Sequence, residues 1–173
     1  MKESRIRAAG GCIVAKDTHR ILLQQRTING SFPRNWGFFG GKVEENENIA
    51  QALLRELTEE ISLSVEDDVV KIYPLDQYHT RTGEFSYYSF VILVKKEFIP
   101  KTNNETGGYA WVETNYIPKP LHPGTRRTLF RKKRLKIIKD IISSLWESLN
   151  HPKYSCKREV LRRHSESYNK LRK

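Results

Sequence analysis

The stretch that decides this chain is 41-GKVEENENIAQALLRELTEEISL-63, in which acidic side chains recur at helical spacing. A helix turns by about 100° per residue, so Leu53 lies about 40° from Ile49 around the helix axis. On the same scale Glu56 and Glu60 fall at about 340° and about 20°. These carboxylates therefore flank the apolar stripe, whereas a solvated helix would place its charges on the opposite side.

The crowding of like charges in this stretch calls for a cation. Glu56, Glu59 and Glu60 are spaced i, i+3 and i+4, which destabilises a helix by roughly 0.2–0.5 kcal/mol per pair. Mg²⁺ or Mn²⁺ fits, because hard cations take carboxylate and carbonyl oxygens and keep positions for water and phosphate. Gly40 and Gly41 predict a turn in which the backbone can approach such an ion closely. The alternative, a glutamate-rich surface helix, does not explain the adjoining glycines.

The same stretch resembles the box of the Nudix hydrolase family, G-x5-E-x7-R-E-U-x-E-E-x-G-U, where U is bulky and apolar. The matching residues are Gly41, Glu47, Arg55, Glu56, Leu57, Glu59, Glu60 and Leu63. Ser62 stands where the family has its last glycine. A serine in the left-handed conformation expected there costs up to about 1–2 kcal/mol, but it neither adds nor removes a metal ligand. The resemblance implies hydrolysis of a nucleoside diphosphate linked to another group.

The resemblance also implies roles for individual residues. The expected ligands of Mg²⁺ or Mn²⁺ are Glu56, Glu59 and Glu60, with the Gly40 backbone carbonyl and Glu47. Arg55 is expected to brace the site by pairing with Glu47. A loop glutamate, Glu105, is expected to take part in catalysis as well. The expected catalytic residues are therefore Arg55, Glu56, Glu59, Glu60 and Glu105.

Besides Gly40, three of the predicted site residues lie outside the box. Arg26 matches an arginine that contacts substrate phosphate in MutT-type members, and Phe38 matches an aromatic residue beside the nucleoside. An ordinary strand-end arginine and a core phenylalanine are the alternatives. Glu105 lies in a polar loop, which suits a mobile metal ligand or general base, although such a residue is usually only solvated. The weaker alternatives for the base are Glu84, Glu113, His79 and His122.

Charge divides the chain unevenly. Residues 1–118 contain 14 basic and 16 acidic residues, whereas residues 119–173 contain 17 basic and 4 acidic residues. The dense segment Arg126–Arg134 has three explanations: RNA or another polyanion as partner, steering of a polyphosphate substrate, or solvation of a helix. The residues leave the three open, and no nucleic-acid motif supports the first.

Composition predicts a folded, intracellular protein. The chain is 38% hydrophobic, and it has no apolar run long enough for a membrane span and no apolar core of a secretory signal. Its cysteines, Cys12 and Cys156, form neither a disulfide framework nor a metal-ligand spacing. A reducing cytoplasm is therefore the expected setting, with Cys12 in the core.

Alternating and helical patterns predict an α/β chain. Strands are expected at about 5–15, 20–26, 36–39, 69–80, 85–97 and 109–113, and helices at about 46–61, 126–149 and 157–171. The resemblance implies a Nudix-type α/β/α sandwich with a mixed sheet. We expect a Nudix hydrolase domain at 1–149 and a basic helical C-terminal extension at 150–173.

Substrate identity is the least determined feature of the sequence. The segment WGFFGGKVE and Arg26 favour a nucleoside or deoxynucleoside triphosphate, cleaved to a monophosphate and pyrophosphate by metal-activated water. Capped RNA, ADP-ribose, nucleotide sugars and dinucleoside polyphosphates stay open as alternatives, because a fold does not fix specificity. A non-catalytic nucleotide sensor that binds nucleic acid is a second class of hypothesis, and an isomerase is a remote third.

Overall fold

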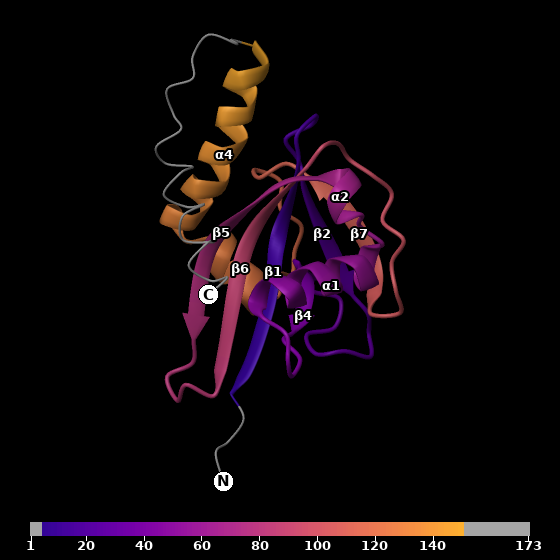
Figure 1. Ribbon diagram of the computed structural model, residues 1–173, viewed down its shortest axis with the longest axis vertical. Helices are drawn as coiled ribbons and strands as arrows, with labels where there is room; N and C mark the ends of the chain where they lie inside the picture. Colours follow the sequence, from indigo (N-terminus) through magenta and orange to yellow (C-terminus); the bar gives the residue numbers. More distant parts are fainter. Residues whose placement is uncertain (1–4, 151–173) are drawn as a thin grey trace.

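The computed structural model describes residues 5–150 of the chain, with side chains described up to residue 144. Its strands are β1 (Ile6–Ala15), β2 (Ile21–Arg26), β3 (Trp36–Gly37), β4 (Phe39–Lys42), β5 (Val69–His79), β6 (Phe85–Val94) and β7 (Thr106–Val112). Its helices are α1 (Ile49–Ile61), α2 (Val65–Asp68), α3 (Pro123–Leu129) and α4 (Lys132–Asn150). The strands form one sheet, as shown in Figure 1.

Strand β1 organises the sheet. It runs parallel to β6 along its whole length and pairs antiparallel with β4 and with β2 at its two ends. Strand β5 extends the sheet beyond β6, and β7 extends it beyond β2, both antiparallel. The sheet is therefore mixed, as the sequence pattern and the Nudix resemblance indicate.

Two apolar layers cover the two faces of this sheet. Alternate residues of β1 point to opposite faces, so Ile13 joins the buried cluster under α1 and Val14 joins the cluster under α3 and α4. In Figure 1, α1 crosses one face of the sheet while α4 (orange) lies beside β5. The chain is thus an α/β/α sandwich, which confirms the predicted fold class.

The basic segment at 126–149 is not one helix, and that prediction was wrong. α3 ends at Leu129, its C-cap is Phe130, and α4 begins at Lys132. Leu129 and Ile138 are nine residues apart, which puts them on opposite sides of a continuous helix. Both are buried in the same cluster. The break lets both side chains reach the sheet. The helix expected at 157–171 lies outside the described residues.

The segment around the glycines differs from the expected turn. Gly40 and Gly41 lie inside β4, where they pair with Gly10 and Ala9 of β1. The following helix begins three residues later than expected because Asn48 caps it, accepting hydrogen bonds from two backbone N–H groups. The short helix α2 was not predicted. The consequence for the site is that a strand, rather than a loop, fixes the two glycines opposite α1.

Candidate active site

The two glycines of β4 are needed because other groups come unusually close to them. A Cβ at Gly41 would lie 2.3 Å from Oε1 of Glu56, so only glycine leaves room for that carboxylate. Gly40 has a φ of 135°, and a Cβ there would lie 2.2 Å from the carbonyl oxygen of Ala9. A side chain at either position would move β4 or expel the glutamate.

Glu60 is the most deeply buried carboxylate of the box. It is 4% exposed, and its Oε2 accepts a hydrogen bond of 2.6 Å from the backbone N–H of Gly40. Burial raises the pKa of Glu60 to about 7, and the charges of Glu56 and Glu105 act in the same direction. The hydrogen bond from Gly40 and the amide of Gln24 act the other way. A buried carboxylate with acidic neighbours is a group that a cation would stabilise.

Arg55 ties three glutamates and one strand together. Its guanidinium donates to Glu47 at 2.8 and 3.2 Å, and to Glu56 and Glu59 at 3.1 Å each. A further bond of 2.9 Å reaches the carbonyl oxygen of Lys42 at the end of β4. Hydrogen bonds from Arg55 lower the pKa of Glu47, and those contacts raise the pKa of Arg55 above its already high value. The expected pairing of Arg55 with Glu47 is therefore present in the structure.

The donor set fits a divalent cation by its chemistry, although the carboxylates are not already gathered around one point. Within residues 5–150, no three acidic, histidine or cysteine side chains converge closely enough to hold an ion as they stand. Glu56 and Glu59 instead share Nη1 of Arg55. Burial raises the pKa of Glu56, an effect to which the charges of Glu59 and Glu105 add. Carboxylates with this mutual repulsion are suitable ligands for Mg²⁺ or Mn²⁺.

Glu105 lies just before β7 and is exposed. Its backbone carbonyl accepts a hydrogen bond of 3.1 Å from Thr27, which holds the loop against the end of β2. Its charge raises the pKa of both Glu56 and Glu60.

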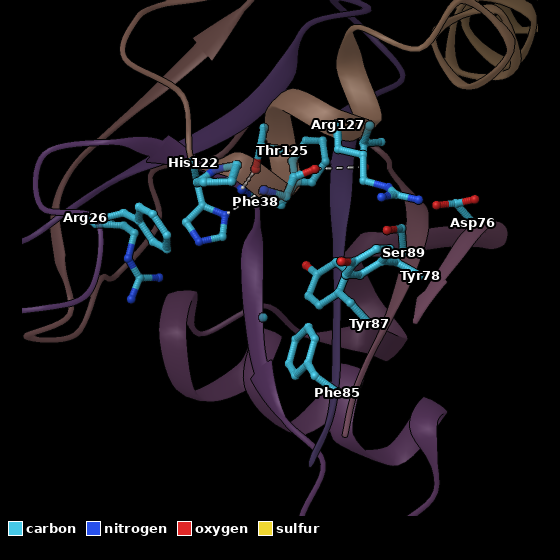
Figure 2. Close-up of a pocket in the computed structure, with 15 residues that line it drawn as sticks. Arg26, Phe38, Asp76, Tyr78, Phe85, Tyr87, Ser89, His122, Thr125 and Arg127 are labelled. Atoms are coloured by element: carbon cyan, nitrogen blue, oxygen red, sulfur yellow. Dashed lines mark hydrogen bonds between the residues drawn. The ribbon is translucent and has the colours of Figure 1, made fainter. Parts of the chain in front are cut away.

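Gly40 also lines a cavity of about 500 Å³. Figure 2 shows this cavity. Its lining includes both predicted substrate residues, Arg26 and Phe38. Arg26 donates to the Ser31 carbonyl oxygen at 2.7 Å, which fixes its side chain by the loop that follows β2. The remaining lining residues are Phe32, Asp76, Tyr78, Phe85, Tyr87, Ser89, His122, Pro123, Gly124, Thr125, Arg127 and Thr128.

Among the alternatives for the base, His122 lines the cavity. Burial and the charge of Arg26 lower its pKa, so its imidazole is neutral at neutral pH. Its Nδ1 accepts a hydrogen bond of 3.2 Å from Gly124, which leaves the proton on Nε2. His79 and Glu84 bond instead to Ser86 and Thr82, in and beside the β5–β6 hairpin.

Sequence reasoning missed two residues beside the glutamates. Gln24 is 2% exposed and joins Phe38 to Thr106. Its side-chain N–H donates to the carbonyl oxygen of Phe38, and its side-chain oxygen accepts from the hydroxyl of Thr106. Tyr87 lines the cavity, and burial together with the charge of Glu60 raises its pKa. A polar residue two positions after the buried Leu22 was a detectable signal for Gln24. The sequence contains no comparable signal for Tyr87, because aromatic residues are expected in a buried strand.

Comparison with known proteins identifies the family of this chain. A family model described as NUDIX domain matches residues 5–132, and the chain therefore belongs to the Nudix hydrolase family, with MutT-like relatives. The nucleoside triphosphatase NudI of Klebsiella pneumoniae (strain 342) is 30% identical over 132 residues, which cover 69% of this chain and 92% of that protein. These matches confirm the family that the box indicates.

Two further proteins are similar to this chain. An 8-oxo-dGTP diphosphatase of Proteus vulgaris is 40% identical over 65 residues, 38% of this chain and 57% of that protein. The crystal structure of a MutT Nudix hydrolase from Burkholderia pseudomallei superposes with a TM-score of 0.57 at 25% identity, covering 71% of this chain and 94% of that one. Within residues 5–150, no helix has the length and apolar character needed to cross a bilayer.

Proposed function

We propose that this chain is a Mg²⁺- or Mn²⁺-dependent pyrophosphohydrolase that cleaves a nucleoside or deoxynucleoside triphosphate to a monophosphate and pyrophosphate. The observation that carries the proposal is the position of Gly40. Its N–H binds the buried carboxylate of Glu60, while the same residue lines the cavity that contains Arg26 and Phe38. A nucleotide in this cavity would therefore have its phosphates beside the acidic cluster.

The dimensions and lining of the cavity support a nucleotide. Ligand sites commonly measure about 300–1,000 Å³ and combine apolar walls with a few polar groups. Phe38, Phe85 and Tyr87 supply aromatic wall, and Arg26 supplies a positive charge for phosphate. The names of two relatives, a nucleoside triphosphatase and an 8-oxo-dGTP diphosphatase, support the same substrate class.

In the proposed reaction the oxygen of water forms a bond to phosphorus and the bond to the bridging oxygen breaks. Glu56, Glu59 and Glu60 would hold the cation, together with the Gly40 carbonyl and Glu47. A bound divalent cation neutralises phosphate charge and lowers the pKa of water. Positioning of the reacting groups and transfer of the proton come from side chains of the protein.

Three side chains position the reacting groups. Arg55 keeps Glu56 and Glu59 on one side of α1 through its shared guanidinium. Glu105, from a loop close enough to influence the charge on Glu60, accepts the proton of the attacking water. Arg26 orients the phosphate chain.

A substrate panel tests the proposal. The purified chain is incubated with Mg²⁺ or Mn²⁺ and with the eight common ribo- and deoxynucleoside triphosphates, ADP-ribose, a nucleotide sugar, a dinucleoside polyphosphate and capped RNA. We expect monophosphate and pyrophosphate from triphosphates, and no turnover after chelation with EDTA. Cleavage of another class alone would overturn the substrate assignment. Nucleotide binding without any hydrolysis, with salt-dependent retention on heparin, would support the sensor hypothesis instead.

A further inference from the structure

Arg127 of α3 lines the cavity without a hydrogen-bond acceptor. Its guanidinium stacks over the ring of Tyr78, with 4.0 Å from Cζ to the ring centroid. Its Nε is buried without a hydrogen-bond partner within residues 5–150. A guanidinium carries five N–H donors, so most of its hydrogen-bonding capacity is unused. Buried donors are usually satisfied, and such an exception calls for a missing acceptor.

The acidic side chain that lines the same cavity does not supply that acceptor. Asp76 also lines the cavity, and Figure 2 shows the Arg127 guanidinium directed toward its carboxylate. Asp76 is already paired with Arg134 of α4 at 2.5 Å. Arg134 also donates to the backbone carbonyl of Arg127 at 3.3 Å, which holds α3 and α4 together. Arg134 is thus the ionic partner of Asp76 through Oδ2, and Arg127 is left to the cavity.

The two ends of the cavity differ in chemistry. Figure 2 shows Arg26 on one side, and Arg127 with Asp76 and Tyr78 on the other. Under the proposed function the phosphates lie beside Glu60, which accepts from the Gly40 N–H, and beside Arg26. The base then lies toward Tyr78 and Arg127, where a flat ring would meet aromatic side chains and unused N–H donors.

We propose that Arg127 is a specificity-determining residue that donates hydrogen bonds to the keto oxygen of a guanine-type base. Arginine is the side chain best suited to the acceptor edge of guanine, whereas the corresponding amino group of adenine is itself a donor and would repel it. Asp76 lies beside Arg127 with unused lone pairs for the N–H group that neighbours a keto oxygen. The inference rests on the proposed function and names the base that the same site prefers.

Steady-state kinetics with dGTP, dITP and dATP test this inference. dITP keeps the keto oxygen and lacks the amino group of guanine, so it isolates the contact assigned to Arg127. We expect wild type to favour dGTP and dITP over dATP, and Arg127→Met to reduce this preference by about tenfold to hundredfold, mainly through KM. Arg127→Lys keeps a charge and a donor but loses the planar fork, so we expect an intermediate preference.

The neighbouring arginine provides the matched control. Arg126 is exposed on the same helix and does not line the cavity, so Arg126→Met should keep the wild-type preference. An unchanged ratio of dGTP to dATP in Arg127→Met, or an equal loss on all three nucleotides, would overturn the inference.

Binding of the products separates this inference from the proposed function. Calorimetric titration with dGMP and dAMP requires no turnover. Tighter binding of dGMP that depends on Arg127 would support base recognition even if no triphosphate were cleaved. Equal affinity for dGMP and dAMP in a protein that does cleave triphosphates would refute base recognition and leave the hydrolase proposal standing.

Discussion

Two arginines on opposite faces of the sheet have contrasting surroundings. Arg55 on α1 donates to three glutamates and a backbone carbonyl, so that its charge is fully used within the protein. Arg127 on α3 is stacked on one tyrosine and, within the described part of the chain, has no acceptor. Arg55 therefore positions the cluster, whereas Arg127 is available to a ligand. Under the two proposals, arginines of equal charge have different roles because their neighbouring acceptors differ.

The largest expected effect concerns the carboxylates of the α1 face. Glu60→Gln keeps the size of the side chain but removes a ligand, so we expect kcat to fall by about a hundredfold or more. Glu59→Gln should also lose most turnover. Thermal unfolding should show no loss of stability in Glu60→Gln, because a buried charge disappears. Glu66→Gln, an exposed substitution on α2, is the control. Near-wild-type turnover in Glu59→Gln and Glu60→Gln would remove both residues from the catalytic group.

The pH dependence of stability tests the charge on that face. The pKa of Glu60 is raised from 4.5 to about 7 on folding, so the folded state binds more protons than the unfolded state between these values. The contribution of Glu60 to the free energy of unfolding is therefore lost as the pH rises from 4.5 to about 7, by about 3 kcal/mol in total. In urea unfolding with EDTA, the free energy of unfolding of Glu60→Gln should rise relative to that of wild type as the pH increases from 5 to 8. A difference between the two proteins that does not change with pH would contradict this.

Removing each arginine compares the two faces directly. Arg55→Met leaves Glu47 and Glu56, which are 14% and 15% exposed, without their partner, and should cost about 2 kcal/mol of unfolding free energy. Arg127→Met loses only a stacking contact and should cost about 0.5–1 kcal/mol. Chemical denaturation of both proteins measures the difference. Equal losses of unfolding free energy in the two variants would contradict the described difference between the surroundings of Arg55 and Arg127.

The smallest expected effect lies at the end of α1. Ser62 has a φ of 53° and a ψ of 36°, in the left-handed region where glycine carries no steric penalty. Ser62→Gly should therefore raise the unfolding free energy by about 1 kcal/mol, with kcat unchanged because Ser62 contacts no part of the site. Chemical denaturation and turnover of this variant provide both readouts. A fall in kcat would show that the end of α1 affects the chemistry.

Local spacing explains why the α1 face was predictable. The box lies within 23 consecutive residues, and one helix fixes the direction of Arg55, Glu56, Glu59 and Glu60. The mixed sheet and most strands also followed from alternation and from the resemblance. Where the sequence was misread, as in the single helix at 126–149, burial of Leu129 and Ile138 on one face overrode local propensity.

The cavity could not be predicted in the same way, because tertiary pairing assembles it. Tyr78 comes from β5, Tyr87 from β6 and Arg127 from α3, and no short spacing links them. Arg127 lies in a basic segment whose members look equivalent in the sequence. Only the structure shows that Arg134 is buried against Asp76 while Arg126 is exposed.

The short connection between Phe38 and Gly40 couples the two faces. The Phe38 N–H donates to Thr125 of α3 at 3.1 Å, and the Gly40 N–H donates to Glu60 of α1 at 2.6 Å. Inserting or deleting one residue between them would reverse the direction of one N–H group and detach one helix. Variants of this enzyme with altered preference should therefore arise by exchange of side chains around the cavity, while the length of this segment stays fixed.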